Sequence, residues 1–373
     1  MDATYLIIGG GMTGDAAVKG IREHDATGRI VLVGSEQHPP YKRPPLTKGL
    51  WSGADEAKIW KEAAKEHAEL VLGRRIVSLD PAAKRAVDDA GEVYCYDKVL
   101  LATGGSPRRL PGFSGDRVIY FRTLDDYRRL RDLAGTGRRI TVVGGGFIGS
   151  EIAAALAGAG ATVSMLFPEK GIASRVLPPD LSQFVTDYYR EKGVEVRTGE
   201  SLSSPDELDT DAVVAGLGIV PNVELAEQAG LPVDDGIVVD EYGRVEGDVF
   251  AAGDVAKYPS IALGKRFRVE HEDHANTHGR IVGANMAGAG VAYDHIPFFY
   301  SDLFDLGYEA VGEVDSRHAT IESWQEPFRK GTIAYVDDDR RPRGFLMWNV
   351  WDRVDAAREL IRAGEPIGEG ALV

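Results

Sequence analysis

Short apolar runs that end in glycine recur along the chain. Residues 5–8 form one such run, and small apolar residues after the glycines continue it as a helix. Residues 140–143 begin a second copy of the same pattern, which continues to residue 156. The glycines have GxGxxG spacing in both copies; they are Gly9, Gly11 and Gly14 in the first and Gly144, Gly146 and Gly149 in the second. An apolar run followed by these glycines predicts a buried strand that turns tightly into a helix.

Each glycine of such a turn has its own physical role. The first permits the turn, the second lets a pyrophosphate approach the backbone, and the third lets the helix pack on the strand. The helix N-terminus then points at the anion. Glu36 and Glu169 each follow the next predicted strand, where a carboxylate accepts hydrogen bonds from ribose hydroxyls. The chain is therefore predicted to carry two dinucleotide sites, and the economical use of two sites is electron transfer between a nicotinamide and a flavin.

Two further apolar runs end in residues suited to a ligand. Residues 98–102 lead into Thr103 and Gly104, and residues 249–252 lead into Gly253 and Asp254. The carboxyl ends of strands form the edge at which open α/β sheets bind ligands. We expect Asp254 to accept a hydrogen bond from a polyol hydroxyl; the alternative is that it caps the following turn.

A proline-rich loop, residues 38–48, follows Glu36. Because prolines exclude helix and stiffen the backbone, this loop can hold Arg43 and Lys48 beside the first glycine turn. Arg43 can then neutralise a pyrophosphate, and Lys48 can reach a cofactor ring. The alternative is a surface loop with solvated cations.

The last third of the chain has a different pattern. A helix is expected to begin near residues 269–274 and to continue through Asn285; its N-terminus could place positive partial charge under an electron-rich ring carbonyl. His274 and His278 have i, i+4 spacing, but no third ligand has a matching spacing, so we expect no metal site. From about Pro297, aromatic and alternating segments followed by a helix from Val354 to Ala363 predict an α+β domain.

Composition narrows the possible functions. A length of 373 residues with 43% hydrophobic residues predicts two or three domains. A net charge of −15 disfavours nonspecific binding to nucleic acid or to an anionic membrane. No apolar run reaches about 18 residues and no leader precedes the first strand, so we expect no membrane span and a cytoplasmic location. The single cysteine, Cys95, excludes an internal disulfide or a CxxC pair and is expected in the core.

With these residues placed, the chain resembles the pyridine-nucleotide-dependent flavoprotein reductases of the ferredoxin reductase and apoptosis-inducing factor type, in the pyridine nucleotide-disulfide oxidoreductase superfamily. The motifs that carry the resemblance are the two glycine turns, the Pro-Pro-Tyr-Lys-Arg-Pro-Pro-Leu-Thr-Lys run, Ala102 to Gly104, Gly216 to Asn222 and Ala252 to Val255. Residues 166–171, 269–271, 301–303 and 307–310 follow the apoptosis-inducing factor branch. Tyr300 stands where the family commonly has tryptophan. The long insertion, leader and basic surface of the animal proteins are missing, so we expect no cell-death or DNA-binding role.

The resemblance implies an α/β fold with two Rossmann-like dinucleotide-binding domains, as in glutathione reductase, and a C-terminal α+β domain. It implies FAD and NAD(H) as cofactors and no metal. The implied FAD contacts are Gly9, Gly11, Gly14, Glu36, Arg43, Lys48, Thr103, Gly104, Arg122, Gly253 and Asp254, with Glu270 and His271 on the flavin side. The implied NAD contacts are Gly144, Gly146, Phe147, Ile148, Gly149, Glu151, Glu169 and Gly218. The implied catalytic residues are Lys48, Glu151, His271 and Tyr300, and Phe147 is a further candidate for the nicotinamide pocket.

The expected domain order follows from one requirement. Gly9 and Asp254 must meet one cofactor although the second glycine turn lies between them in sequence. We therefore expect a discontinuous FAD domain at residues 1–112 and 234–292, an NAD(H) domain at 113–233 and a C-terminal domain at 293–373.

The leading hypothesis is an FAD-dependent NADH oxidoreductase that transfers hydride from NADH to FAD and passes electrons to an unidentified acceptor. A ferredoxin, a rubredoxin, a quinone and oxygen are the acceptors considered. The alternatives are a dedicated ferredoxin or rubredoxin reductase, or a redox-gated binding protein that responds to NADH. NADH is expected to be preferred over NADPH, because Glu169 would repel a 2′-phosphate; Lys170 and Arg175 weaken this expectation. A homodimer is left open.

Overall fold

The chain forms two compact units, each built from separate segments of the sequence. A computed structural model describes residues 1–202 and 204–371. The first unit contains residues 1–43, 56–106 and 220–297, and the second contains residues 44–55, 107–219 and 298–373. Among the described residues, no helix is long and apolar enough to cross a membrane.

An eight-stranded sheet organises the first unit, with strand order β15-β16-β6-β1-β2-β3 and with β5 and β4 continuing from β6. The central strands β16, β6, β1, β2 and β3 run parallel, as the apolar runs before the glycines predict. The strands are β1 (Asp2–Ile8), β2 (Ile30–Gly34), β3 (Glu69–Leu72), β4 (Ile76–Asp80), β5 (Arg85–Asp88), β6 (Val93–Leu101), β15 (Arg244–Glu246) and β16 (Val249–Ala251).

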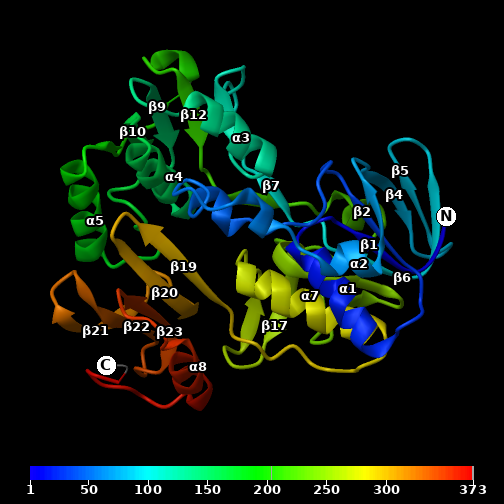
Figure 1. Cartoon of the computed structure of the whole chain (residues 1–373). Helices are drawn as coiled ribbons and strands as arrows, with labels where there is room; N and C mark the ends of the chain where they lie inside the picture. The colour runs from blue at the N-terminus through cyan, green and yellow to red at the C-terminus, as the bar shows by residue number, and fades with distance from the viewer. Residues whose placement is uncertain (203, 372–373) are drawn as a thin grey trace. The chain divides into compact units, whose positions relative to one another are not determined.

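Two long helices of the first unit, α1 (Met12–His24) and α7 (Glu272–Met286), lie side by side (Figure 1). Glycine makes this close packing feasible: a Cβ added at Gly20 would lie 1.9 Å from the carbonyl oxygen of Arg280, and one at Gly283 would lie 2.2 Å from that of Ala17. The first glycine turn and the N-terminus of α7 are thereby held in one unit.

The remaining elements of the first unit are short. They are η2 (Glu56–Ile59), α2 (Ala63–His67), α6 (Glu224–Gln228), β14 (Ile237–Val238), η4 (Gly253–Val255), β17 (Ala256–Ser260) and β18 (Lys265–Phe267). Strands β14, β17 and β18 form a separate small sheet. Strands β7 (Gly105–Pro107) and β13 (Ile219–Pro221), where the chain passes between units, pair with each other.

The second unit contains two five-stranded sheets. A parallel sheet has the order β11-β10-β9-β12-β8, and an antiparallel sheet has the order β19-β20-β23-β22-β21. The strands are β8 (Val118–Tyr120), β9 (Arg139–Val143), β10 (Thr162–Phe167), β11 (Glu195–Thr198), β12 (Ala212–Ala215), β19 (Phe298–Leu303), β20 (Leu306–Gly312), β21 (Ala319–Glu326), β22 (Lys330–Val336) and β23 (Pro342–Trp348).

The second unit also contains α-helices and short 3-10 helices. They are η1 (Pro44–Thr47), α3 (Leu124–Leu133), α4 (Phe147–Gly158), α5 (Pro179–Glu191), η3 (Pro205–Glu207) and α8 (Val354–Ala363). α8 has the predicted bounds and packs on β20 and β23 of the antiparallel sheet. The predicted α/β fold class is confirmed. Each of the two glycine turns lies between a parallel strand and a helix, and a helix covers the C-terminal sheet.

The expectation for Cys95 is wrong, because its side chain is exposed. It lies on β6, where Tyr94 and Tyr96 on either side are buried. Successive side chains of a strand point to opposite faces, so this end of β6 buries its tyrosines and turns Cys95 outward.

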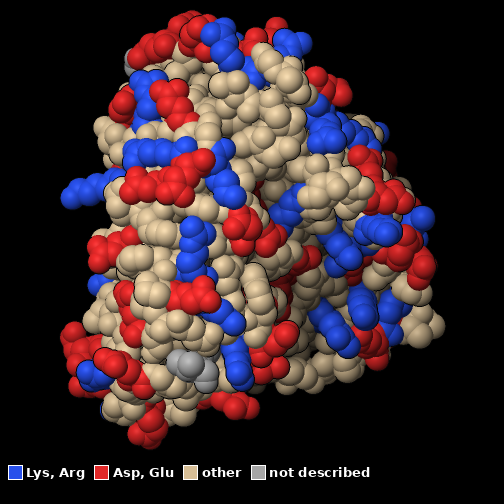
Figure 2. Space-filling view, turned by 60° about the vertical axis from the view of Figure 1, so that its left-hand side comes forward, with Lys and Arg blue, Asp and Glu red and all other residues tan. Residues whose placement is uncertain are grey.

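Charged side chains of both signs are mixed over the face shown in Figure 2. Ion pairs of the second unit such as Arg117 with Asp206 and Arg190 with Asp187 join neighbouring surface groups. Exposed pairs of this kind add little to stability because water screens them.

Candidate functional site

The first glycine turn has one open position between two crowded ones. Gly9 has φ +133°, and a Cβ there would lie 2.0 Å from the carbonyl oxygen of Ala102. A Cβ at Gly14 would lie 2.2 Å from the carbonyl oxygen of Gly9, whereas no heavy atom lies within 4 Å of a Cβ at Gly11. The backbone at Gly11 is therefore accessible to a ligand, while Gly9 and Gly14 are required for packing.

The second glycine turn repeats this arrangement. A Cβ at Gly144 (φ +118°) would lie 2.3 Å from the carbonyl oxygen of Gly216, and one at Gly149 would lie 2.0 Å from that of Gly144. Gly146 faces open space, with no heavy atom within 4 Å of a Cβ. Neither Gly11 nor Gly146 can cap its helix with a side chain, so backbone N–H groups at both helix starts are available to an anion. Both turns fit the pyrophosphate of a dinucleotide.

Glu36 lies after β2 in a network of polar groups from the proline-rich loop. Its carboxylate accepts a hydrogen bond of 2.6 Å from the Tyr41 hydroxyl and forms an ion pair of 2.6 Å with Arg43. Arg43 also donates to the Tyr41 hydroxyl at 3.1 Å. The loop thus holds Arg43 beside Glu36 in the first unit.

The strand ends near the first turn are joined by hydrogen bonds. The Thr103 hydroxyl donates to the carbonyl oxygen of Asn222 at 2.7 Å, and the Asn222 N–H donates to the carbonyl oxygen of Gly104 at 2.9 Å. Gly253 is buried with φ +74°, and its N–H donates to Nδ1 of His278 at 3.3 Å. Asp254 follows in η4, so its position depends on a turn held by a buried histidine.

His271 is the N-cap residue of α7, and its side chain makes no capping hydrogen bond to the helix. Loss of hydration lowers the pKa of His271 to about 4, so its ring is neutral near pH 7. Glu270 forms an ion pair of 2.6 Å with Arg268. Because the imidazole ring is neutral, it adds no charge to the positive partial charge of the helix N-terminus.

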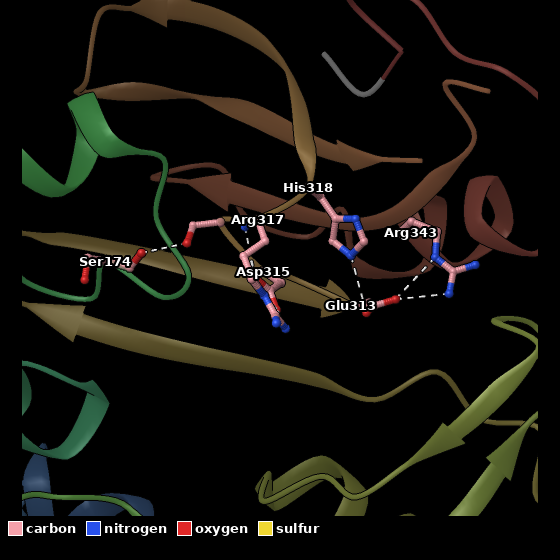
Figure 3. A network of polar contacts seen from close by, with 7 residues as sticks. Ser174, Glu313, Asp315, Arg317, His318 and Arg343 are labelled. Atoms are coloured by element: carbon pink, nitrogen blue, oxygen red, sulfur yellow. Dashed lines mark hydrogen bonds and ion pairs between the residues drawn. The ribbon is translucent and has the colours of Figure 1, made fainter. Parts of the chain in front are cut away.

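Glu169 follows β10 and forms an ion pair of 3.0 Å with Arg175. The segment after Glu169 is held by the antiparallel sheet (Figure 3). Ser316 donates its hydroxyl to the carbonyl oxygen of Ser174 at 2.7 Å and its N–H to that of Arg175 at 3.0 Å. Figure 3 also shows Glu313 between Arg343, which lies on β23, and His318. The ion-pair distances are 3.0 Å to Arg343 and 3.3 Å to His318. The two Ser316 contacts fix the backbone at Ser174 and Arg175, next to the Arg175–Glu169 pair.

Lys48 and Glu151 meet in the second unit. The Lys48 ammonium lies 2.6 Å from Oε2 of Glu151, and the two side chains are only 14% and 5% exposed. The ring of Tyr300 on β19 lies with its centroid 5.0 Å from the same ammonium, which is a cation–π contact. Phe147 at the start of α4 packs edge-to-face on Phe299, with ring centroids 5.0 Å apart. The structure therefore brings three of the four predicted catalytic residues together.

Thr47 and Ser301 also contact Glu151, and sequence reasoning did not single them out. Thr47 donates its hydroxyl to Oε2 at 2.6 Å, and Ser301 donates its hydroxyl to Oε1 at 2.7 Å. Thr47 precedes Lys48 and Ser301 follows Tyr300 in the sequence. No local pattern indicates that both hydroxyls contact Glu151, which is distant from each in the sequence.

Four other predicted residues are described here by the unit or element that carries them. His271 belongs to the first unit, whereas Lys48, Glu151 and Tyr300 belong to the second. Arg122 precedes α3, where its N–H donates to Asp126 at 3.1 Å. Ile148 is exposed on the first turn of α4, and Gly218 (φ +79°) accepts a hydrogen bond from the N–H of Arg108 at 2.9 Å.

Comparison with known proteins agrees with both turns and with the C-terminal sheet. The family model described as pyridine nucleotide-disulphide oxidoreductase matches residues 3–279. A second model, described as the C-terminal part of mitochondrion-associated apoptosis-inducing factor, matches residues 282–327.

Several relatives match along most of their length. Apoptosis-inducing factor 1, mitochondrial, of Dictyostelium discoideum is 33% identical over 96% of this chain and 78% of its own. Putidaredoxin reductase of Pseudomonas putida is 32% identical over 89% of this chain and 84% of its own. The crystal structure of a covalent putidaredoxin reductase–putidaredoxin complex superposes with a TM-score of 0.91 at 29% identity, covering 98% of this chain and 94% of that chain. The chain therefore belongs to the pyridine nucleotide-disulphide oxidoreductase family and is an FAD-dependent NAD(H) oxidoreductase.

Proposed function

We propose that the protein transfers electrons from NADH to a small one-electron carrier of the ferredoxin or rubredoxin class. NADH supplies a hydride, and FAD supplies an acceptor that can release the electron pair one electron at a time. One NADH and two oxidised carriers then give NAD⁺, two reduced carriers and one proton. The solved relative in complex with putidaredoxin supports a small redox protein as the partner.

The buried Lys48–Glu151 pair is the observation that carries this proposal. A buried ammonium needs its carboxylate, because removal of one partner leaves an uncompensated charge. An ammonium held in place favours negative charge that arrives nearby during a reaction, since a fixed charge requires no reorganisation. We assign Lys48 to stabilise electron density on the flavin and Glu151 to hold Lys48. Tyr300 covers the ammonium and, with Phe147, is assigned to the nicotinamide pocket.

We assign the other predicted residues by the element that carries them. Gly9, Gly11, Gly14, Glu36, Arg43, Thr103, Gly104, Gly253 and Asp254 are proposed to bind FAD, together with Arg122, Glu270 and His271. Gly144, Gly146, Ile148, Gly149, Glu169 and Gly218 are proposed to bind NAD(H). The open positions at Gly11 and Gly146 support these two groups.

The domain division is part of the same proposal, with FAD at residues 1–112 and 234–292, NAD(H) at 113–233 and a C-terminal domain at 293–373. Its support is that Gly9 and Asp254 belong to one compact unit although the second glycine turn, between them in sequence, belongs to the other. We place the protein in the cytoplasm, where NADH is formed; fractionation of cells that express a tagged chain tests this assignment.

A redox-gated binding protein is the second candidate function. The match of residues 282–327 to the C-terminal model of apoptosis-inducing factor favours it. In this case reduction by NADH would alter a surface that a partner recognises, and turnover would be slow with every acceptor.

Anaerobic stopped-flow reduction by NADH, followed by turnover with ferredoxin, rubredoxin, quinone and oxygen, tests both candidates. Fast flavin reduction with turnover that is fastest with a ferredoxin or a rubredoxin supports the carrier reductase. Fast reduction with negligible turnover on the whole panel supports the binding protein instead. Lys48→Ala should slow reduction, whereas Lys192→Ala, which removes an exposed ion pair with Asp305 in the same unit, should leave it unchanged.

A further inference from the structure

The carboxylate of Glu151 accepts from three donors that come from two segments far apart in the sequence. Thr47 on η1 and Lys48 just after it both contact Oε2, each at 2.6 Å, and Ser301 on β19 contacts Oε1 at 2.7 Å. Glu151 itself lies in the second turn of α4 and is buried. Both of its oxygens are therefore engaged, and only one of the three donors carries a charge.

The two hydroxyl donors are as buried as the carboxylate. Thr47 is 6% exposed and Ser301 is 1% exposed. Tyr308 lies opposite Ser301 in the pairing of β19 with β20, and its buried hydroxyl is hydrogen-bonded to the Ser301 side chain. Ser301 is thus oriented from one side by Tyr308 and contacts Glu151 on the other.

We propose that Thr47 and Ser301 are positioning residues that set the electrostatic effect of the Lys48–Glu151 pair on the flavin. This inference rests on the proposed function, in which Lys48 acts on the flavin. The two hydroxyls share the negative charge of the carboxylate through hydrogen bonds, so the ammonium is held by Glu151 without being its sole donor. They also fix the plane of the carboxylate, and with it the position of the Lys48 ammonium.

The effect of their loss follows from hydrogen-bond energetics. A buried carboxylate oxygen that loses its donor must be compensated from elsewhere. Lys48 is the one charged donor that remains and already lies 2.6 Å from Oε2. With less of its negative charge shared by hydroxyls, the carboxylate would neutralise the ammonium more completely. The flavin would then experience less positive charge and would be harder to reduce.

The test compares Ser301→Ala, Thr47→Val and Thr47→Ser with the parent holoenzyme. Thr210→Val is the matched control, because Thr210 is a buried threonine of the same unit whose hydroxyl donates only to backbone carbonyls of Arg139 and Ala212. Loss of one hydrogen bond predicts a decrease of about 3- to 10-fold in the limiting rate of flavin reduction for Ser301→Ala and Thr47→Val. The NADH concentration for half-maximal rate should not change, and the flavin midpoint potential should become more negative. Thr47→Ser should restore the rate and the potential, and Thr210→Val should alter thermal stability alone.

A double-mutant cycle separates this role from a structural one. Because both hydroxyls act through the carboxylate, Thr47→Val should shift the midpoint potential in the parent but not in a Glu151→Gln background. Equal shifts in both backgrounds, or parent-like rates and potentials in Ser301→Ala and Thr47→Val, would overturn the inference. If Ser301→Ala does not fold, the Thr47 cycle decides. If the flavin of Lys48→Ala has the parent reduction rate and midpoint potential, the proposed function fails. If Lys48→Ala is impaired but Ser301→Ala and Thr47→Val match the parent, the inference alone fails.

Discussion

Arg175 Nη2 lies 3.0 Å from Oε1 of Glu169, so the carboxylate expected to select the coenzyme is paired with an arginine that is 87% exposed. The arginine contacts Oε1, so a ribose 2′-hydroxyl can still donate to Oε2 of the same carboxylate. An exposed guanidinium can also bind a 2′-phosphate, because arginine matches phosphate geometry. The pair therefore contains one group that favours each coenzyme.

The first prediction concerns coenzyme choice. NADH should reduce the flavin more efficiently than NADPH, because Glu169 repels a 2′-phosphate. Arg175→Ala should increase this preference, and Glu169→Ala should reduce it by about tenfold, which corresponds to 1.4 kcal/mol. Stopped-flow reduction with both coenzymes measures the ratio. If NADPH is as efficient as NADH in the parent protein, Glu169 does not select the coenzyme.

The second prediction separates the crowded glycines from the open ones. Gly11→Ala should fold but bind FAD more weakly, because the added methyl group occupies open space next to the backbone. Gly9→Ala should not yield folded protein, because its Cβ would lie 2.0 Å from the carbonyl oxygen of Ala102. Gly146→Ala is the control that retains FAD and loses affinity for NADH. Flavin content, NADH titration and thermal unfolding distinguish the three, and normal FAD affinity in Gly11→Ala would contradict the assignment.

The third prediction concerns the buried ion pair. Lys48→Ala should slow hydride transfer by about tenfold or more and lower the flavin potential, since a fixed positive charge is lost. Glu151→Ala should shift the same quantities differently, because the lysine charge is then unpaired, and should destabilise the protein by about 3 kcal/mol. Potentiometry and chemical denaturation measure both effects. Variants that lose only stability would show that the pair is structural.

The fourth prediction concerns Tyr300. Tyr300→Ala removes the ring that lies over the Lys48 ammonium and should change the reduction rate or the charge-transfer absorbance with little loss of bound FAD. Tyr300→Phe retains an aromatic ring, so its reduction rate and charge-transfer absorbance should be closer to those of the parent protein. An unchanged spectrum and rate in Tyr300→Ala would indicate that Tyr300 only packs within the C-terminal sheet.

The fifth prediction concerns pH. Burial lowers the pKa of His278 from 6.5 to about 3, so the folded protein keeps this ring neutral where the unfolded chain binds a proton. The resulting stability is present above about pH 6.5 and is lost as the pH falls toward 3, by about 1.4 kcal/mol per pH unit for one proton. His278→Gln should reduce this dependence while its amide oxygen still accepts from Gly253. His24→Gln, at the exposed end of α1, is the control. Denaturation between pH 4 and 7 measures the slope, and equal slopes for His278→Gln and the parent would contradict the prediction.

The sequence by itself determined the two glycine turns and the class of ligand that they bind. Part of their role is local, because Gly14 and Gly149 pack on the carbonyl oxygens of Gly9 and Gly144 in the same turn. The carbonyl oxygens that crowd Gly9 and Gly144 belong to Ala102 and Gly216, which lie far along the chain. The parallel strands and the final helix were predictable because apolar runs and their period are local properties. The same reasoning failed for Cys95, because an apolar strand with one half-exposed end does not show in its sequence which residues face outward.

Only the tertiary structure decided how Glu151 is held. Thr47 lies at the end of η1 with Lys48 just after it, and Ser301 lies on β19, all far from α4 in sequence. Hydrogen bonds between distant segments leave no periodic pattern in the chain. Resemblance to a family indicated Lys48 and Glu151 as site residues. It did not indicate that the hydroxyls of Thr47 and Ser301 donate hydrogen bonds to the Glu151 carboxylate. A hydroxyl in a loop or in a strand has the same local signature whether it faces a carboxylate or water, so its partner is fixed only when the chain has folded.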